Sequence, residues 1–229
     1  MVALGDVGHK GWCKANPRKV IHMDQRAPIT VGFDLDMTLV DTRNGIKVAY
    51  DLLAAETGTA IDSDLVVSRL GPPVEREMAN WFPAEEVDAM ADRYRALYAV
   101  HGVADCVALP GAYEALAAVR KHGGRSIVVT GKYTPNARLN LEAVDLRVDM
   151  LHGSVFGPGK GAVLLAEGAG VYVGDHLGDI EGARAGTALS VAVPTGPYTA
   201  AELRTAGADV VLPDLTAFPD WLDGYLTAA

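Results

Sequence analysis

The sequence predicts an α/β fold, a Rossmann-like parallel sheet flanked by helices on both faces, with an α-helical segment inserted after the first strand. Short apolar runs alternate with helical patterns, which is typical of parallel βαβ units. Several of these runs are apolar throughout, as expected for strands that helices cover on both faces. One long stretch breaks the alternation, because it contains several amphipathic patterns but no convincing strand.

Composition limits the possible partners. The chain has 229 residues, 49% of them hydrophobic, which is enough for one large domain or for one domain with an insertion. Its net charge of −9 argues against nucleic acid or an anionic membrane as main partner, because both attract Lys and Arg. Two cysteines, Cys13 and Cys106, are too few for a disulfide framework, and no apolar run is long enough to span a membrane. We therefore expect a cytoplasmic protein, a monomer or a homodimer, with no nucleic-acid or membrane partner.

The sheet is predicted from residues 29–41 and 110–229, which would form the α/β core. Residues 1–28 precede it and are expected to be a weakly structured leader, since they are basic and rich in Gly, Pro and His. The candidate strands, in chain order, are Ile29–Asp34, Ser126–Thr130, Met150–His152, Val171–Asp175, Leu189–Val193 and Val210–Leu212. Each of them is short and rich in apolar residues, as strands of such a sheet are.

Helices are expected between these strands. One is predicted over Gly111–Lys121, where two glycines follow, and another from an N-cap at Thr134 to Val144, where Pro135 suits the first turn. Residues 42–109 are predicted to form a helical cap inserted after the first strand. Its prolines separate the helices, and one helical stripe predicts a packing face. The stripe consists of Val87, Met90, Ala91, Tyr94, Leu97 and Tyr98.

The first predicted strand runs into two carboxylates, Asp34 and Asp36, with Thr38 two residues further on. Reactive groups in open α/β sheets gather at the carboxyl ends of strands, so this turn is a candidate site. A turn in which the Asp side chains merely cap the backbone is the alternative. An EF-hand is excluded, because Leu39 and Gly45 stand where its loop needs Gly and Glu.

A second apolar strand also ends in acids, Asp175 and Asp179. Carboxylate oxygens suit a hard cation such as Mg²⁺, which keeps water beside a few such ligands. Four acids that converge at two strand ends would repel one another unless a cation lay among them. We therefore expect a Mg²⁺ site at this edge of the sheet.

Between the two acidic motifs lie residues that suit a phosphate group. Thr130 ends a strand with a hydroxyl, Gly131 permits close approach of the backbone, and Lys160 adds positive charge near a predicted helix start. Taken singly, each has an ordinary structural explanation, such as a cap or a solvated side chain. A nucleotide P-loop is excluded, because Ser154 replaces its first Gly and no Ser or Thr follows Lys160.

Taken in order, these motifs resemble those of the haloacid dehalogenase superfamily, in particular its phosphatases with a helical cap after the first motif, such as phosphoglycolate phosphatase. The resemblance covers residue 29 to the C-terminus. It rests on Asp34-x-Asp36-x-Thr38, Thr130, Lys160 and Gly174-Asp175-x-x-x-Asp179. One departure, Met37 where the family usually has Gly, leaves the carboxylate and hydroxyl positions in place.

The resemblance implies a HAD-like core and a role for each motif residue. Asp34 would be the nucleophile that forms an aspartyl-phosphate, and Asp36 the general acid and base. Thr130, Gly131 and Lys160 would bind the phosphate. Mg²⁺ would be held by Asp34, the backbone carbonyl of Asp36 and Asp175, and Asp179 and Thr38 would support these ligands.

The expected activity is Mg²⁺-dependent hydrolysis of a small phosphate ester, of the phosphoglycolate or sugar-phosphate type. A phosphosugar mutase shares every core motif and stays open, as does a catalytically idle interaction module of the same fold. Phosphonate hydrolysis is disfavoured, since it uses a cap lysine in this family and residues 48–109 contain no Lys. The turn Gly71-Pro72-Pro73, with Glu75 and Arg76 after it, either faces the site or is a rigid link between cap helices.

Overall fold

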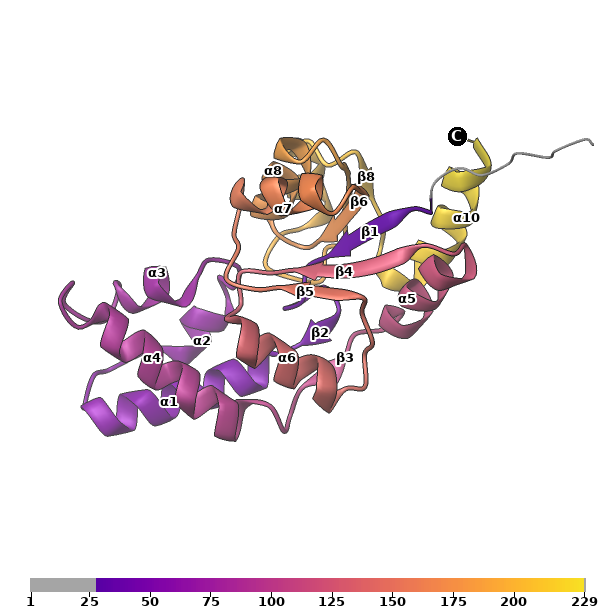
Figure 1. Ribbon diagram of the computed structural model, residues 1–229. Helices are drawn as coiled ribbons and strands as arrows, with labels where there is room; N and C mark the ends of the chain where they lie inside the picture. The colour runs from indigo at the N-terminus through magenta and orange to yellow at the C-terminus, as the bar shows by residue number, and fades with distance from the viewer. Residues whose placement is uncertain (1–27, 229) are drawn as a thin grey trace, which may run out of the picture.

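Six parallel strands form the central sheet of the computed structural model, which describes residues 28–228 (Figure 1). Apart from Pro28, the predicted leader lies outside this range. The strand order is β5-β4-β1-β6-β7-β8, so β1 lies at the centre. The strands are β1 (Thr30–Phe33), β4 (Arg125–Val129), β5 (Met150–His152), β6 (Ala169–Gly174), β7 (Leu189–Ala192) and β8 (Val210–Val211). All six predicted strands are present within a residue or two of their expected ends, and the fold class is confirmed.

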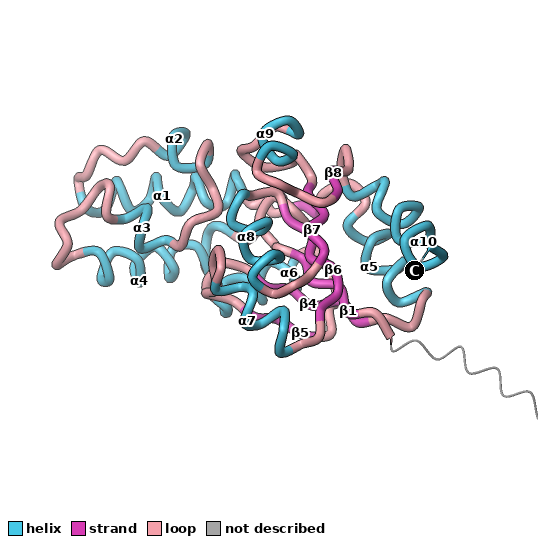
Figure 2. The backbone as a smooth tube through the Cα atoms, turned by 90° about the horizontal axis from the view of Figure 1, so that it is seen from above, coloured by secondary structure: helices cyan, strands magenta, loops and turns pink. Residues whose placement is uncertain are grey.

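Helices cover both faces of the sheet (Figure 2). On one face lie α5 (Ala112–Lys121), α6 (Thr134–Ala143) and α10 (Phe218–Ala228), with the short 3₁₀-helix η2 (Leu215–Ala217). On the other lie α7 (Gly159–Ala166), α8 (Leu177–Ala185) and α9 (Ala200–Thr205). The predicted helices over 111–121 and 134–144 are observed, although Tyr133 rather than Thr134 precedes the first helical residue of α6.

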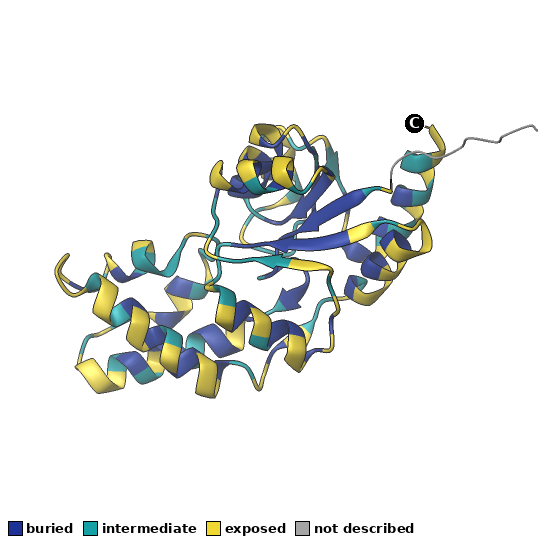
Figure 3. Cartoon of the chain, in the orientation of Figure 1, coloured by how far each residue is buried: buried dark blue, intermediate teal, exposed yellow. Residues whose placement is uncertain are grey.

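The sheet separates one large apolar cluster on one face from two smaller clusters on the other, because alternate residues of a strand point to opposite faces. Val31 and Phe33 of β1 pack towards α5 and α10, and the ring of Phe33 meets that of Phe218 at 5.5 Å between centroids. Ile127 and Tyr172 face α7 and α8 instead. Burial of both faces explains why the strands are apolar throughout, and Figure 3 shows β1 and most of β4 as buried.

The segment between β1 and β4 is mainly helical. It contains α1 (Arg43–Thr57), α2 (Ser63–Val67), α3 (Val74–Met78), α4 (Val87–Leu97) and a π-helical turn η1 (Tyr98–Gly102). These helices lie beside the carboxyl edge of the sheet and have an apolar cluster of their own, in which Tyr94 and Leu97 of α4 pack with Tyr50 and Leu53 of α1 (Figure 1). The helical stripe predicted on α4 is thus a packing face.

The expectation that residues 42–109 lack a strand is wrong at one place. Val40–Asp41 (β2) pairs antiparallel with Val107–Ala108 (β3), where the chain leaves the core and returns to it. Two residues are too few to show an alternating pattern, so the sequence could not reveal them. Among the described residues, no helix is both long and apolar enough to cross a membrane.

Candidate active site

Three neighbouring strands bring the predicted site residues together. β1 lies between β4 and β6, and in register Phe33 faces Val128 on one side and Val173 on the other. All three strands are parallel, so the residues that follow them meet at one edge of the sheet. Asp34 therefore lies between the end of β4, which leads to Thr130, and the end of β6, which leads to Asp175.

Asp34, Asp175 and Asp179 form a buried acidic cluster, in which one oxygen from each carboxylate lies within 4.8 Å of the others. Burial raises the pKa of Asp34 to about 6, although the nearby Lys160 opposes the rise. Burial and the other two carboxylates raise the pKa of Asp175 well above its usual range. The Thr38 hydroxyl donates a hydrogen bond of 2.6 Å to Asp175.

This donor set fits a divalent cation. Among the described residues, one buried ammonium group, that of Lys160, faces the three buried carboxylates, so the cluster carries more negative than positive charge when all are ionised. Oxygen ligands of this kind are those that Mg²⁺ takes in proteins. Asp34 and Asp175, two of the expected cation ligands, both lie in this cluster, together with Asp179.

Lys160 is the second residue of α7, and it is 2% exposed. Its ammonium group donates to Asp34 at 3.0 Å, to Asp179 at 2.6 Å and to the hydroxyl of Tyr172 at 2.8 Å. Burial alone would lower its pKa, but the charges of Asp179 and Asp34 raise it above its usual value, so it stays charged. Because all three donors are engaged, Lys160 can reach a phosphoryl group only by exchanging one of these partners.

Asp36 lies apart from the acidic cluster and faces the cavity between sheet and cap helices. Its carboxylate accepts one hydrogen bond of 2.6 Å from the Thr42 hydroxyl and another of 2.9 Å from the Lys132 ammonium group. Lys132 in turn lies 4.1 Å from the centre of the Tyr98 ring. These contacts hold the Asp36 side chain in one orientation.

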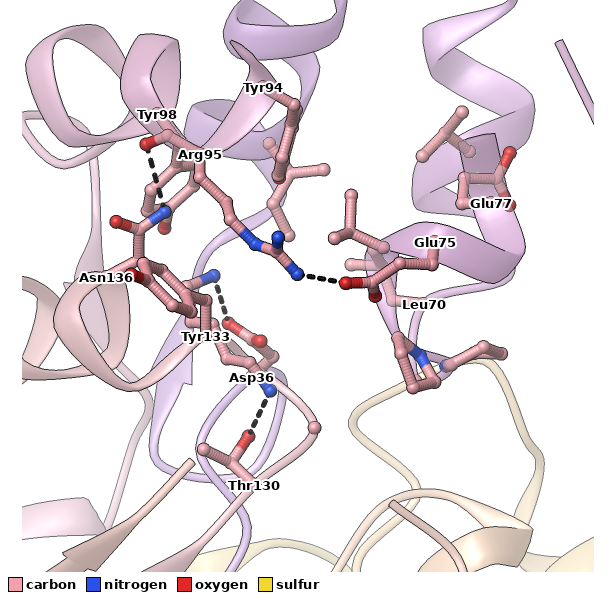
Figure 4. Close-up of a pocket in the computed structure, with 18 of the residues that line it drawn as sticks. Asp36, Leu70, Glu75, Glu77, Tyr94, Arg95, Tyr98, Thr130, Tyr133 and Asn136 are labelled. Carbon is pink, nitrogen blue, oxygen red and sulfur yellow. Dashed lines mark hydrogen bonds and ion pairs between the residues drawn. The ribbon is translucent and has the colours of Figure 1, made fainter. Parts of the chain in front are cut away.

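Thr130 and Gly131 form the wall of the cavity at the end of β4. The Thr130 hydroxyl accepts a hydrogen bond from the backbone of Lys132 at 3.2 Å (Figure 4). A Cβ atom on Gly131 would lie 3.1 Å from the carbonyl oxygen of Gly71, so the cap turn approaches the core closely here. The Gly71-Pro72-Pro73 turn and Glu75 line the cavity, whereas Arg76 packs over the Phe156 ring instead.

The cavity has a volume of about 220 Å³. Its core side is made by Asp34, Asp36 and the residues after β4, and its cap side by α1, α3 and α4. In Figure 4, Arg95 of α4 and Glu75 of α3 bridge the cap side, and Asp36 lies below them. The cap side is also lined by Ile46, Tyr50, Val66, Arg69, Leu70, Val74, Glu77 and Tyr94.

The motifs assign no role to three residues that organise this site. Tyr172 reads as one more apolar residue of a buried strand, yet its hydroxyl contacts Lys160 and donates to the Val129 carbonyl at 2.6 Å. Thr42 directly follows β2, Lys132 lies three residues after the end of β4, and both donate to Asp36. A buried strand that contains Tyr is a usable signal, because a buried hydroxyl needs a partner.

Comparison with known proteins gives a consistent result. A family model described as haloacid dehalogenase-like hydrolase matches residues 31–184, and one for related hydrolases matches residues 162–218. Phosphoglycolate phosphatase of Caulobacter vibrioides is 28% identical over 204 residues, which are 80% of this chain and 86% of that protein. Phosphoglycolate phosphatase of Rhodospirillum rubrum is 30% identical over 220 residues, 85% of this chain and 91% of that protein.

Two further matches bear on the fold. The tyrosine-protein kinase PtkA of Mycobacterium tuberculosis is 28% identical over 173 residues, 69% of this chain and 60% of that protein. The crystal structure of a predicted phosphatase from Clostridium acetobutylicum superimposes with a TM-score of 0.74 at 22% identity. It covers 89% of this chain and 100% of the other, so nearly the whole fold is shared.

Proposed function

Because this chain belongs to the haloacid dehalogenase-like hydrolase family, as a hydrolase of the phosphatase type, we propose that it hydrolyses a small phosphorylated metabolite with Mg²⁺. The reaction would pass through an aspartyl-phosphate on Asp34. The observation that carries the proposal is the position of Asp34, at the end of the central strand with Lys160 and Asp175 beside it and the cavity in front. Asp36 faces the same cavity.

Mg²⁺ would be held by Asp34, the backbone carbonyl of Asp36 and Asp175. Asp179 would support this site by accepting a hydrogen bond from Lys160. Thr38 would support it by donating a hydrogen bond to Asp175. When bound, the cation supplies positive charge that offsets repulsion between these carboxylates and a phosphate dianion. The close approach of the buried Asp34 and Asp175 carboxylates supports this assignment.

The two acids would divide the chemistry between them. A carboxylate oxygen of Asp34 attacks phosphorus, and the bond to the leaving oxygen breaks as that oxygen takes a proton from Asp36. Asp36 then removes a proton from a water molecule whose oxygen attacks the phosphorus of the aspartyl-phosphate. The bond between phosphorus and the Asp34 oxygen breaks, which releases phosphate and restores Asp34. Thr42 and Lys132 would hold the Asp36 carboxylate in place for both transfers.

Thr130, Gly131 and Lys160 would bind the phosphoryl oxygens. The Thr130 hydroxyl and the backbone at Gly131 border the cavity beside Asp34, which supports this role. Lys160 already contacts Asp34, the group that the phosphoryl would join. Positive charge and donors fixed at this point would stabilise the charge that develops during transfer.

The test is release of inorganic phosphate from a panel of small phosphomonoesters, with Mg²⁺ and with EDTA. We expect Mg²⁺-dependent turnover that falls on the order of 10³-fold or more in Asp34→Asn, since that change removes the nucleophile and retains the shape. Asp88→Asn, which removes a charge from the exposed face of α4, is the matched control and should keep full activity. Equal activity in Asp34→Asn and the wild-type protein would overturn the assignment.

The same assay separates the other activities that share this core. A mutase would convert one sugar-phosphate isomer into another without net phosphate release. A kinase activity like that named for the mycobacterial relative would transfer phosphate from ATP to protein. An idle module would show no turnover and no tight Mg²⁺ binding. Each of these results would contradict the proposal.

A further inference from the structure

Two tyrosine hydroxyls in the cap make no hydrogen bond to any residue between 28 and 228. Tyr50 of α1 is 2% exposed and Tyr94 of α4 is 8% exposed, and both line the cavity above Asp36. Their rings lie 4.5 Å apart between centroids. Within the described part of the chain, neither hydroxyl makes a hydrogen bond. Among the described residues only Arg95 Nε and Ser126 Oγ are fully buried side-chain polar atoms without a hydrogen bond, so the two tyrosine hydroxyls are open to the cavity. Each can therefore donate a hydrogen bond to a ligand and accept one from it.

The charged groups of the cap side are already balanced. Arg69 binds Glu77 through two hydrogen bonds, of 2.6 Å and 2.9 Å, and Arg95 is paired with Glu75 across the cavity (Figure 4). No cation among the described residues that line the cap side lacks a carboxylate partner. A negatively charged leaving group would therefore meet two acids and no free positive charge.

The cavity has room for more than a phosphoryl group. At about 220 Å³ it would hold roughly seven water molecules at about 30 Å³ each. Its cap side, which Tyr94 and Glu75 line, therefore borders space that a leaving group can occupy.

We propose that the cap binds a neutral, polyhydroxylated leaving group, so that the substrate is a sugar phosphate or sugar-alcohol phosphate rather than phosphoglycolate. This rests on the proposed phosphatase function. Hydroxyl groups both donate and accept, so a polyol can satisfy Tyr50 and Tyr94, donate to Glu75 and accept from Arg95 together. The paired charges reject a carboxylate and tolerate a polyol, because rejection of a wrong partner comes from unfavourable contacts.

The experiment compares kcat/KM for phosphoglycolate with kcat/KM for glycerol, pentose and hexose phosphates. We expect the wild-type protein to prefer at least one of the polyol phosphates. In Tyr50→Phe and Tyr94→Phe, the ratio of kcat/KM for that substrate to kcat/KM for phosphoglycolate should fall about five- to tenfold, the loss of one hydrogen bond. Tyr113→Phe, which removes a hydroxyl on α5 outside the cavity, should leave the ratio unchanged.

Thermal unfolding separates a binding role from a structural one. Since neither hydroxyl bonds to the described chain, Tyr50→Phe and Tyr94→Phe should melt no lower than the wild-type protein. Melting points lowered by several degrees would show that the hydroxyls support the fold and would overturn the subsite.

Glu75→Gln tests whether the paired charges on the cap side exclude a carboxylate. It removes the carboxylate that Arg95 contacts across the cavity and leaves only Asp92 paired with the guanidinium, so selectivity should move towards phosphoglycolate by about tenfold or more. Preference of the wild-type protein for phosphoglycolate, or no response of selectivity to any of these variants, would overturn the polyol assignment and leave the phosphatase function standing. No hydrolysis of any ester would instead contradict the phosphatase function itself.

Discussion

Asp34 is a nucleophile candidate held in conditions that disfavour its charge. It is almost fully buried with two other carboxylates close by, and the buried ammonium group of Lys160 contacts it. Burial raises its pKa from 3.8 to about 6. In the absence of a bound cation, the ionised form therefore costs folding free energy, and this cost has a definite dependence on pH.

We expect the metal-free protein to lose stability relative to Asp34→Asn as the pH rises. Below about pH 4 both folded and unfolded chains hold the Asp34 proton, and between pH 4 and pH 6 only the folded chain holds it. The wild-type protein therefore loses up to about 3 kcal/mol of unfolding free energy between pH 4 and pH 6. The variant does not lose this free energy, because the asparagine side chain does not titrate. Urea unfolding in EDTA between pH 4.5 and pH 7.5 measures the difference.

Mg²⁺ supplies the control for this prediction. Above pH 6 the added cation should stabilise the wild-type protein more than Asp34→Asn, because the ionised carboxylate is then a ligand. A difference in unfolding free energy that is constant across the pH range would show that burial does not perturb Asp34.

Met37 shows what a motif can and cannot predict about a residue. Its φ angle is +60°, in the left-handed region where Gly is favoured, which explains why the haloacid dehalogenase superfamily usually has Gly at this position.

The sequence predicted that Asp34, Asp36, Thr130 and Asp175 lie at one edge of the sheet, because each follows or ends a predicted strand. It did not reveal that Lys132 holds Asp36, because that contact joins residues 96 positions apart and no motif records it.

At the scale of elements, the position of Lys160 depends on close packing between α7 and α8. A Cβ atom on Gly161 would lie 2.6 Å from the Ala185 side chain, and one on Gly182 would lie 2.8 Å from the Cβ of Lys160. Glycine at both positions lets the two helices approach, and Asp179 on α8 then meets Lys160 on α7. The helices thus carry the two ends of one ion pair.

Gly161→Ala should move α7 away from α8. The added methyl group overlaps backbone atoms of Ala185, so we expect a loss of about 1–3 kcal/mol in unfolding free energy and a fall in kcat, because Lys160 shifts from Asp34. Gly170→Ala is the matched control, since a Cβ there meets nothing within 4 Å. Urea unfolding and phosphate release measure both variants, and equal stability of the two would contradict the packing argument.

Element boundaries were predictable where the pattern was long. The strands from β1 to β8 in the main sheet carry apolar runs, and α4 carries a stripe of three turns. The two-residue strands β2 and β3 carry neither, since their pairing comes from the place where the chain enters and leaves the cap. Which cap side chains meet the core also depends on tertiary packing, so Tyr50 and Tyr94 could be read only as apolar positions.

At the scale of the whole molecule, a buried polar network joins the cap to the core. The Tyr98 hydroxyl of η1 donates to Asn140 of α6 at 3.0 Å, and the amide of Asn140 donates to the Cys106 sulfur at 3.0 Å. Cys106 donates in turn to the Gly102 carbonyl at 3.3 Å. Each side has its own apolar cluster, so this network is a specific link between two bodies that pack separately.

Tyr98→Phe and Asn140→Ala should therefore be coupled. Tyr98→Phe leaves the buried Asn140 side-chain oxygen without its donor, and Asn140→Ala leaves the Tyr98 hydroxyl with only the Cys106 sulfur at 3.6 Å. Each change should lower the unfolding free energy by about 1–3 kcal/mol. The double variant should lose less than the sum of the two, by on the order of 1 kcal/mol, because the second change removes the group that the first had orphaned. Urea unfolding of the wild-type protein, the two single variants and the double variant measures this coupling as a double-mutant cycle. Losses that add within about 0.5 kcal/mol would show that the hydrogen bond does not join cap and core.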